Sequence, residues 1–221
     1  MRVLLTLALT FAGMAYSFSE ARAGSPLFWL GVSLPYLLLV ALALHKMWDE
    51  GTLLELLTPR WGDLSLGALS MMGLLFASWA ARKILSPAGS PRQAWLFRIY
   101  LQLGNPEHLQ RSTAYTLLIL AICAAEEIVW RGLVLGDLTQ RFGRRAALPL
   151  SALAYGVSAL PTLWLLRDPV AGLNPLLITA AVGCGLVWSF LAAQLGRLTP
   201  VVISHMAFTY FTIVQFHLPG L

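Results

Sequence analysis

The sequence predicts an all-α fold, a polytopic bundle of about seven transmembrane helices. Of its 221 residues, 58% are hydrophobic and only 11% are charged, whereas soluble domains carry about a quarter charged residues. The mean hydropathy is +0.73, and uncharged runs close to the roughly 20 residues that cross a bilayer recur along the whole chain. A water-soluble fold of this size could not bury so much apolar surface. We therefore expect an integral, multi-pass membrane protein.

Apolar runs are expected to form the spans, and they cover residues 3–18, 27–44, 64–81, 113–135, 147–166, 176–195 and 200–216. The first run is ambiguous. Arg2, the apolar stretch and the small-residue triplet at 21–23 also resemble a secretory signal with its cleavage site. Both interpretations stay open, and a retained span is the one we favour.

Basic residues occupy the short connections between the runs. The net charge is +5 and the pI is about 9.6, and in a membrane protein this excess is expected to meet anionic lipid headgroups rather than nucleic acid. The richest connection is 82–112, in which residues 93–103 place Arg98 and Gln102 on one stripe of a predicted helix. Two interpretations fit this helix: it lies at the headgroup level, or it packs between spans.

The fourth run, TAYTLLILAICAAEEIVWRGLVL, carries charges that are costly inside a membrane. Glu127 and Arg131 are four residues apart, so one helical face brings them together as an ion pair. Glu126 points about 100° away from its neighbour. Desolvated and next to a like charge, Glu126 should hold a proton more readily than an exposed glutamate, which suits a general base. The structural alternative is an ion pair plus a hydrogen bond from Glu126 to a neighbouring helix.

The last run supplies a second polar pair. His205 and Thr209 are four residues apart and lie on one helical face. A histidine in a lipid-embedded helix is expected to face the interior of the bundle. Alone, His205 would more often be an interhelical hydrogen-bonding residue. Together with a buried Glu126 on another helix, it predicts a shared site.

At these residues the chain resembles a known family. EEIVWRG, which begins at Glu126, has the EExxxR pattern of the CPBP family of intramembrane glutamic endopeptidases, which includes CAAX-processing and bacteriocin-processing enzymes. A span near SALAYG, a glycine-rich span at AAVGCGLVW and a histidine-bearing last span follow in the family's order. The resemblance divides the chain into residues 1–112, with the N-terminal spans and the basic connection, and residues 113–221, a CPBP-like catalytic helix core.

The resemblance implies a role for each matching residue. Glu126 would activate the attacking water. Glu127 and Arg131 would form the charge pair that shapes the site, and His205, helped by Thr209, would hold the developing oxyanion.

The chain departs from the family pattern at two positions. The second motif, an aromatic residue followed four residues later by histidine, falls on Tyr155 and Ala159, so the aromatic is kept and the imidazole is absent. The third motif commonly has asparagine four residues after its histidine, where this chain has Thr209. Tyr155, as the aromatic that is kept, and Ser158 are secondary candidates for the site. The hydroxyl of Ser158, next to the gap, or that of Thr162, one turn beyond it, could orient a water, although neither has the basicity of imidazole.

The expected function is that of an intramembrane endopeptidase, which hydrolyses a peptide bond of a membrane-associated or lipid-tethered protein. The resemblance implies a location in a bacterial inner membrane. Its partners would be membrane lipids and that substrate. We expect no cofactor and no metal, because the chain has no HExxH motif and places a single histidine near the carboxylates.

Alternatives from other classes stay open. Ala159 favours a catalytically inactive CPBP-like scaffold, or an immunity or regulatory membrane protein, that keeps the charges to organise its helices. A serine protease would pair Ser158 with His205. The sequence around Ser158 lacks the second glycine of the serine-protease motif, and this function would leave the glutamates without a role. A proton-coupled transporter would also use buried carboxylates, although no internal repeat is visible.

Overall fold

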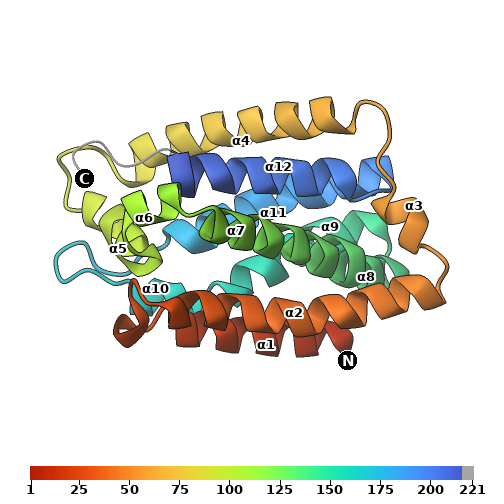
Figure 1. The fold of residues 1–221 in the computed structure, drawn as a ribbon, viewed down its shortest axis with the longest axis horizontal. Coiled ribbons are helices and arrows are strands. Elements are labelled where there is room, and N and C mark those ends of the chain that lie inside the picture. The colour runs from red at the N-terminus through yellow and green to blue at the C-terminus, as the bar shows by residue number, and fades with distance from the viewer. Residues whose placement is uncertain (216–221) are drawn as a thin grey trace.

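The computed structural model describes residues 1–215, where the regular elements are helices apart from an isolated bridge between Asp168 and Gly172 (Figure 1). In chain order these helices are α1 (Arg2–Ser17), η1 (Glu20–Arg22), α2 (Pro26–Asp49), α3 (Leu53–Leu57), α4 (Asp63–Leu85), α5 (Gln93–Leu103), α6 (Pro106–Arg111), α7 (Thr113–Glu127), η2 (Ile128–Val134), α8 (Leu135–Phe142), α9 (Arg144–Ser158), α10 (Pro161–Leu165), α11 (Leu176–Leu195), α12 (Thr199–Thr209) and η3 (Tyr210–Gln215). The predicted all-α fold is confirmed.

Four helical segments of the described chain are long and apolar enough to cross a membrane: α2, α4, α11 and Arg144–Leu165, which joins α9 to α10. The other predicted spans form shorter elements. Run 3–18 becomes the 16-residue α1, run 113–135 is divided between α7 and η2, and run 200–216 becomes α12 and η3. Phe216 lies outside the described residues. The number of seven spans therefore stays a prediction.

The bundle carries apolar side chains on its outside and polar ones within. On α4, for example, Leu69, Met72, Phe76 and Trp79 are 53% to 69% exposed. The buried polar side chains include Glu127, Arg131, Thr162, Ser189, Ser204 and His205. Because lipid is itself apolar, outward apolar side chains lose nothing by exposure to it, whereas polar groups must find partners inside. The polar chemistry is therefore collected in the middle of the bundle.

A continuous helix through the bundle carries the EEIVWRG motif. α7, η2 and α8 follow one another without a break, and α2, α9, α11 and α12 pack around them (Figure 1). The middle part, η2, is π-helical. Such turns insert one extra residue into a helix and are frequent at functional sites. Val129, Trp130 and Val134 are fully buried there, so this stretch is the best-enclosed part of the helix.

Two partly buried ion pairs connect the surrounding helices. On α2, Lys46 Nζ lies 2.6 Å from Oδ1 of Asp137 on α8. At the start of α4, Asp63 Oδ1 lies 2.6 Å from Nη2 of Arg197, which is in the turn between α11 and α12. These pairs hold α2 to the helix that follows the glutamates, and α4 to the turn that leads into the histidine helix.

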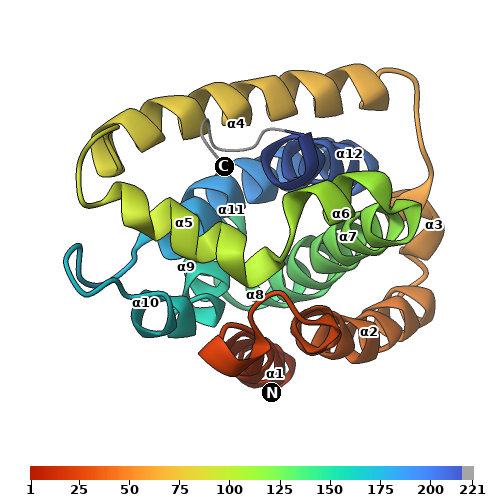
Figure 2. The ribbon, with the colours of Figure 1, turned by 60° about the vertical axis from the view of Figure 1, so that its left-hand side comes forward.

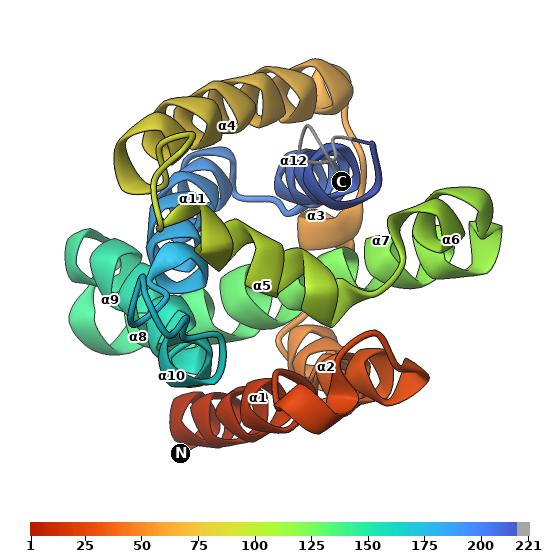
Figure 3. The same cartoon turned by 90° about the vertical axis from the view of Figure 1, so that its left-hand side faces the viewer.

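The helix predicted over 93–103 is present as α5 with those bounds. Gln102 is buried and its Nε2 donates to the carbonyl of Ser17 at 2.7 Å. Trp95 is also buried, and its indole N–H donates to the carbonyl of Gly172 at 3.3 Å. Figures 2 and 3 show α5 lying across one end of the bundle. These contacts are those of the packed-helix interpretation.

Run 147–166 forms two helices rather than one. α9 ends at Ser158 and α10 begins at Pro161. Proline has no N–H to continue the α-helical ladder, and the chain before it tightens, because the amides of Ala159 and Leu160 bond to carbonyls three residues earlier. Ala159, where the family motif has histidine, is buried at this break.

Candidate active site

A buried triad of charged or titratable side chains lies at the centre. Glu127 is fully buried, and its Oε1 accepts a hydrogen bond from Arg131 Nη1 at 3.1 Å. The pair predicted from the four-residue spacing is thus present. The same oxygen lies 2.7 Å from Nδ1 of His205 on α12. Glu127 therefore joins the central helix to the histidine helix, across 78 residues of sequence.

Arg131 is held by two further helices, α9 and α11, besides its contact to Glu127. Its Nη2 donates to the carbonyl of Gly185 on α11 at 3.3 Å. Its guanidinium carbon lies 4.9 Å from the ring centre of Tyr155 on α9 and 5.4 Å from that of Trp188 on α11. An arginine between aromatic faces gains cation–π attraction in addition to its hydrogen bonds. The charge is therefore compensated in a place where water cannot reach it.

Gly185 permits this close packing. A Cβ at that position would lie only 3.3 Å from Ala152 Cα and from Tyr155 Cδ1, which is tighter than ordinary van der Waals contact. The missing side chain lets α9 and α11 approach closely and leaves the Gly185 carbonyl open to the arginine. The glycine-rich sequence AAVGCGLVW thus serves to bring Arg131 and Tyr155 together.

Glu126 is less enclosed than its neighbour and has different partners. Its side chain is 14% exposed, against 0% for Glu127. Tyr155 Oη donates to Glu126 Oε2 at 2.6 Å, and His205 Nε2 lies 3.8 Å from the same oxygen. The two glutamates therefore face opposite edges of one imidazole. In the described chain, no group of three or more His, Cys, Asp and Glu side chains could hold a metal ion.

The orientation of the His205 ring is set by aromatic stacking. The ring lies on Trp188, with centroids 4.0 Å apart and planes 25° apart. Trp188 is fixed in turn, because its indole N–H donates to Ser204 Oγ at 3.1 Å, and Ser204 donates to Ser70 Oγ on α4 at 3.1 Å. In this orientation Nδ1 of His205 contacts Glu127 and Nε2 lies 3.8 Å from Glu126. Cys123 on α7 is a further partner of the ring.

Two of the sequence candidates stand apart from this cluster. Thr209 lies one turn after His205, at the end of α12, and no hydrogen bond joins its hydroxyl to Glu126 or His205 in the part of the chain that the structure describes. The hydroxyl of Ser158 donates to the carbonyl of Tyr155 at 2.7 Å. Its proton is therefore engaged within α9.

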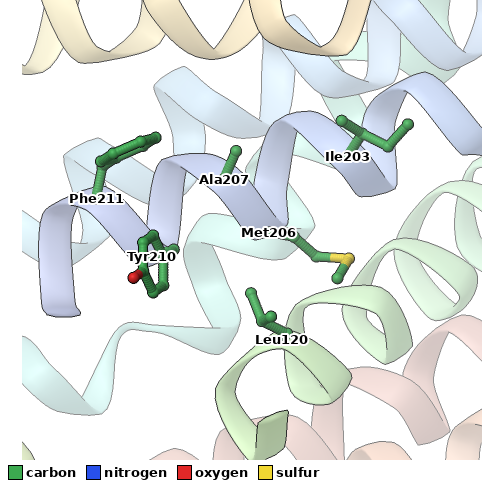
Figure 4. A pocket seen from close by; sticks show the side chains of 6 residues that line it. All are labelled: Leu120, Ile203, Met206, Ala207, Tyr210 and Phe211. Atoms are coloured by element: carbon green, nitrogen blue, oxygen red, sulfur yellow. The ribbon is translucent and has the colours of Figure 1, made fainter. Parts of the chain in front are cut away.

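An apolar cavity of about 340 Å³ flanks the histidine helix. Figure 4 shows Ile203, Ala207 and Phe211 along one edge of the helix stripe that lines it, and Met206 and Tyr210 along the other edge, on the side of Leu120 from α7. Met206 follows His205 in sequence, but neither His205 nor the glutamates line the cavity. Its lining is apolar, which suits a hydrocarbon group rather than a polar one.

Residues 109–211 match the family model described as type II CAAX prenyl endopeptidase Rce1-like. The match covers a little less than half of the chain, and it shows what this part of the chain is similar to. The Rce1-like match runs from α6 into η3 and so contains Glu126, Glu127, Arg131 and His205. No curated protein and no solved structure matches the chain.

The match confirms the resemblance stated from the EEIVWRG motif. Rce1-like proteins are membrane-embedded CAAX-type endopeptidases, so the family supports a protease and gives no support to the inactive alternative. The chain's composition and its four span-length helical segments agree with a membrane-embedded protein.

Sequence reasoning missed two features of the site. It assigned no role to Trp188, although an aromatic residue one turn after Gly185 in a glycine-rich helix is a signal for close ring packing. It also treated Tyr155 as an aromatic residue only. The signal there was the phenol, because a hydroxyl inside a lipid-embedded bundle needs a hydrogen-bond partner.

Proposed function

We propose that the protein is an intramembrane glutamic endopeptidase, in which Glu126 activates a water molecule that hydrolyses a peptide bond of a membrane-associated or lipid-tethered protein. The observation that carries the proposal is the convergence of Tyr155 Oη and His205 Nε2 on one oxygen of Glu126, at 2.6 and 3.8 Å. It supports a shared site at a carboxylate that is still partly accessible.

Glu126 and Glu127 have different roles in this mechanism. Glu127 is fully buried and bound by Arg131 and His205 through one oxygen, so it acts as a fixed anion. Glu126 has no arginine or lysine paired with it in the described chain, and a carboxylate without a fixed cation is the better proton acceptor. General base catalysis by Glu126 is the role that this difference supports.

His205 is suited to stabilise the oxyanion. With Nδ1 directed at the anionic Glu127, that nitrogen carries a proton and Nε2 faces the reacting centre. In the imidazolium form, Nε2–H donates to the oxygen that becomes negative when water attacks the carbonyl. Donors of this kind act strongly in a site from which bulk water is excluded.

The reaction balances with these groups alone. Glu126 takes a proton from water while the water oxygen bonds to the carbonyl carbon, and His205 holds the resulting oxyanion. When the carbon–nitrogen bond breaks, protonated Glu126 gives its proton to the leaving amine. The products are a carboxylic acid and an amine, and Glu126 returns to its starting state.

The test compares cleavage products in membrane vesicles that contain the wild-type protein or the Glu126→Gln variant. New protein termini that depend on Glu126 are quantified by mass spectrometry over time. We expect the variant to lose about 10²- to 10⁴-fold in the rate of their appearance. Glu107→Gln is the matched control, because it makes the same change at a side chain that is 78% exposed on α6. Equal rates in wild type and Glu126→Gln would overturn the proposal.

A further inference from the structure

The hydroxyl of Tyr155 makes a contact in this site that a phenylalanine ring could not make. The family motif asks for an aromatic at this position and a histidine four residues later, and this chain has Ala159 there. The phenol hydroxyl of Tyr155 reaches Glu126 at 2.6 Å. The carboxylate that lacks an imidazole from α9 thus receives a hydrogen bond from the same helix, one turn earlier.

The hydroxyl of Tyr155 has a function separate from that of the ring. The ring packs against Arg131 and lies 5.2 Å from the ring of Trp130, contacts that phenylalanine would also make. The hydroxyl adds the bond to Glu126, and this bond is what orients the carboxylate relative to His205 Nε2. A short, charge-assisted hydrogen bond of this kind is among the stronger ones in proteins.

Position 159 lies on the same side of the chain as Tyr155. Its backbone is still right-handed helical, with φ −85° and ψ −2° at the end of α9, so residues 155 and 159 are separated by about one turn. A histidine at 159 and the tyrosine hydroxyl would therefore approach the site from one direction. Ala159 is buried and has no group that could form a hydrogen bond to Glu126, so from this direction the Tyr155 hydroxyl is the group that does so.

We propose that the Tyr155 hydroxyl is a positioning residue that replaces the missing histidine of the second motif, by holding Glu126 in the orientation in which it accepts a proton from water. The proposal rests on the proposed function. Tyr155 acts through Glu126, and it neither accepts nor transfers the proton itself.

The experiment uses the same vesicles and the rate of Glu126-dependent cleavage. Tyr155→Phe keeps the ring and removes the hydroxyl, and we expect about a 10- to 100-fold lower rate, the range that the loss of a hydrogen bond to a charged group gives. Adding Ala159→His to Tyr155→Phe should restore a large part of the rate. Ala159→His alone should stay near wild type, because the tyrosine already holds the carboxylate.

The matched control is Tyr100→Phe. Tyr100 on α5 also donates a 2.6 Å hydrogen bond, to the carbonyl of Thr212, and this bond does not involve the glutamates. Thermal unfolding of each variant in micelles accompanies the rate measurement. A stability loss shared by both tyrosine variants, with cleavage lost only in Tyr155→Phe, is the expected result.

Three outcomes would overturn the inference: a Tyr155→Phe rate within twofold of wild type, a double variant no faster than Tyr155→Phe, or Ala159→His raising the rate equally in both backgrounds. Each of these leaves the proposed function standing if Glu126→Gln still abolishes cleavage. A Glu126→Gln variant that cleaves normally would instead remove the proposed function, and the inference with it.

Discussion

The Arg131→Met substitution leaves Glu127 without its cation at a fully buried position. It removes the 3.1 Å hydrogen bond to Glu127, the 3.3 Å bond to the carbonyl of Gly185 and two aromatic contacts. Removing one partner of a buried ion pair costs about 3–5 kcal/mol. His205 still contacts the same carboxylate oxygen at 2.7 Å and keeps part of the compensation. We therefore expect a loss near the lower end, about 3 kcal/mol of unfolding free energy.

The assay is equilibrium unfolding in mixed micelles, followed by the fluorescence of the eight tryptophans. The double variant Glu127→Gln/Arg131→Met should recover a large part of the loss, since no charge is then stranded. Arg111→Met is the control, because its pair with Glu107 is 3.9 Å long and about 80% exposed, and such pairs contribute about 0–1 kcal/mol. A loss below 1 kcal/mol for Arg131→Met, or no recovery in the double variant, would refute the reasoning.

Two further substitutions test packing and a loop carboxylate. Gly31→Ala should cost about 1–3 kcal/mol of unfolding free energy in micelles, because its new methyl would meet the Tyr16 ring at 2.5 Å. Gly73→Ala meets nothing within 4 Å and should be neutral or stabilise α4 by up to about 1 kcal/mol; equal losses in the two variants would contradict this. A hydrogen bond from the backbone N–H of Ala171, and a second from that of Val170, hold the pKa of the Asp168 carboxyl below its ordinary value of 3.8. The stability that this carboxylate gives the turn is complete above about pH 4 and is lost as the pH falls through the lowered pKa. The amide chemical shift of Ala171 should follow that titration, and Asp168→Asn should abolish it; a titration that persists in the variant would rule out this cause.

The local features of the site were predictable from the sequence. The spacing of Glu127 and Arg131 fixes their pairing through the helical repeat alone, and a charge in an apolar run must have a partner. The bounds of α5 followed in the same way from its stripe of polar side chains. These inferences needed only neighbours along one helix.

The contacts between helices were not predictable to the same degree. The bond from Tyr155 to Glu126 spans 29 residues, and its existence depends on how closely α9 packs on the central helix. The break before Pro161 had a signal in the proline itself, but span-length apolar runs conceal such interruptions. The π-helical stretch has no signal in the hydrophobic pattern, because it changes the hydrogen-bond register and not the composition.

That stretch, Ile128–Val134, makes the length of the central helix as important as its composition. Each π-type ring holds one residue more than an α-type ring, so the stretch sets the rotational offset between α7, which carries the glutamates, and α8, whose Asp137 is bound to Lys46. Deleting one residue there would rotate α8 by about 100° relative to α7. The contacts of the glutamates and the pair between Asp137 and Lys46 could then not both form. Insertions and deletions among related chains should therefore fall in connections such as 86–92, and spare this helix even where its side chains vary.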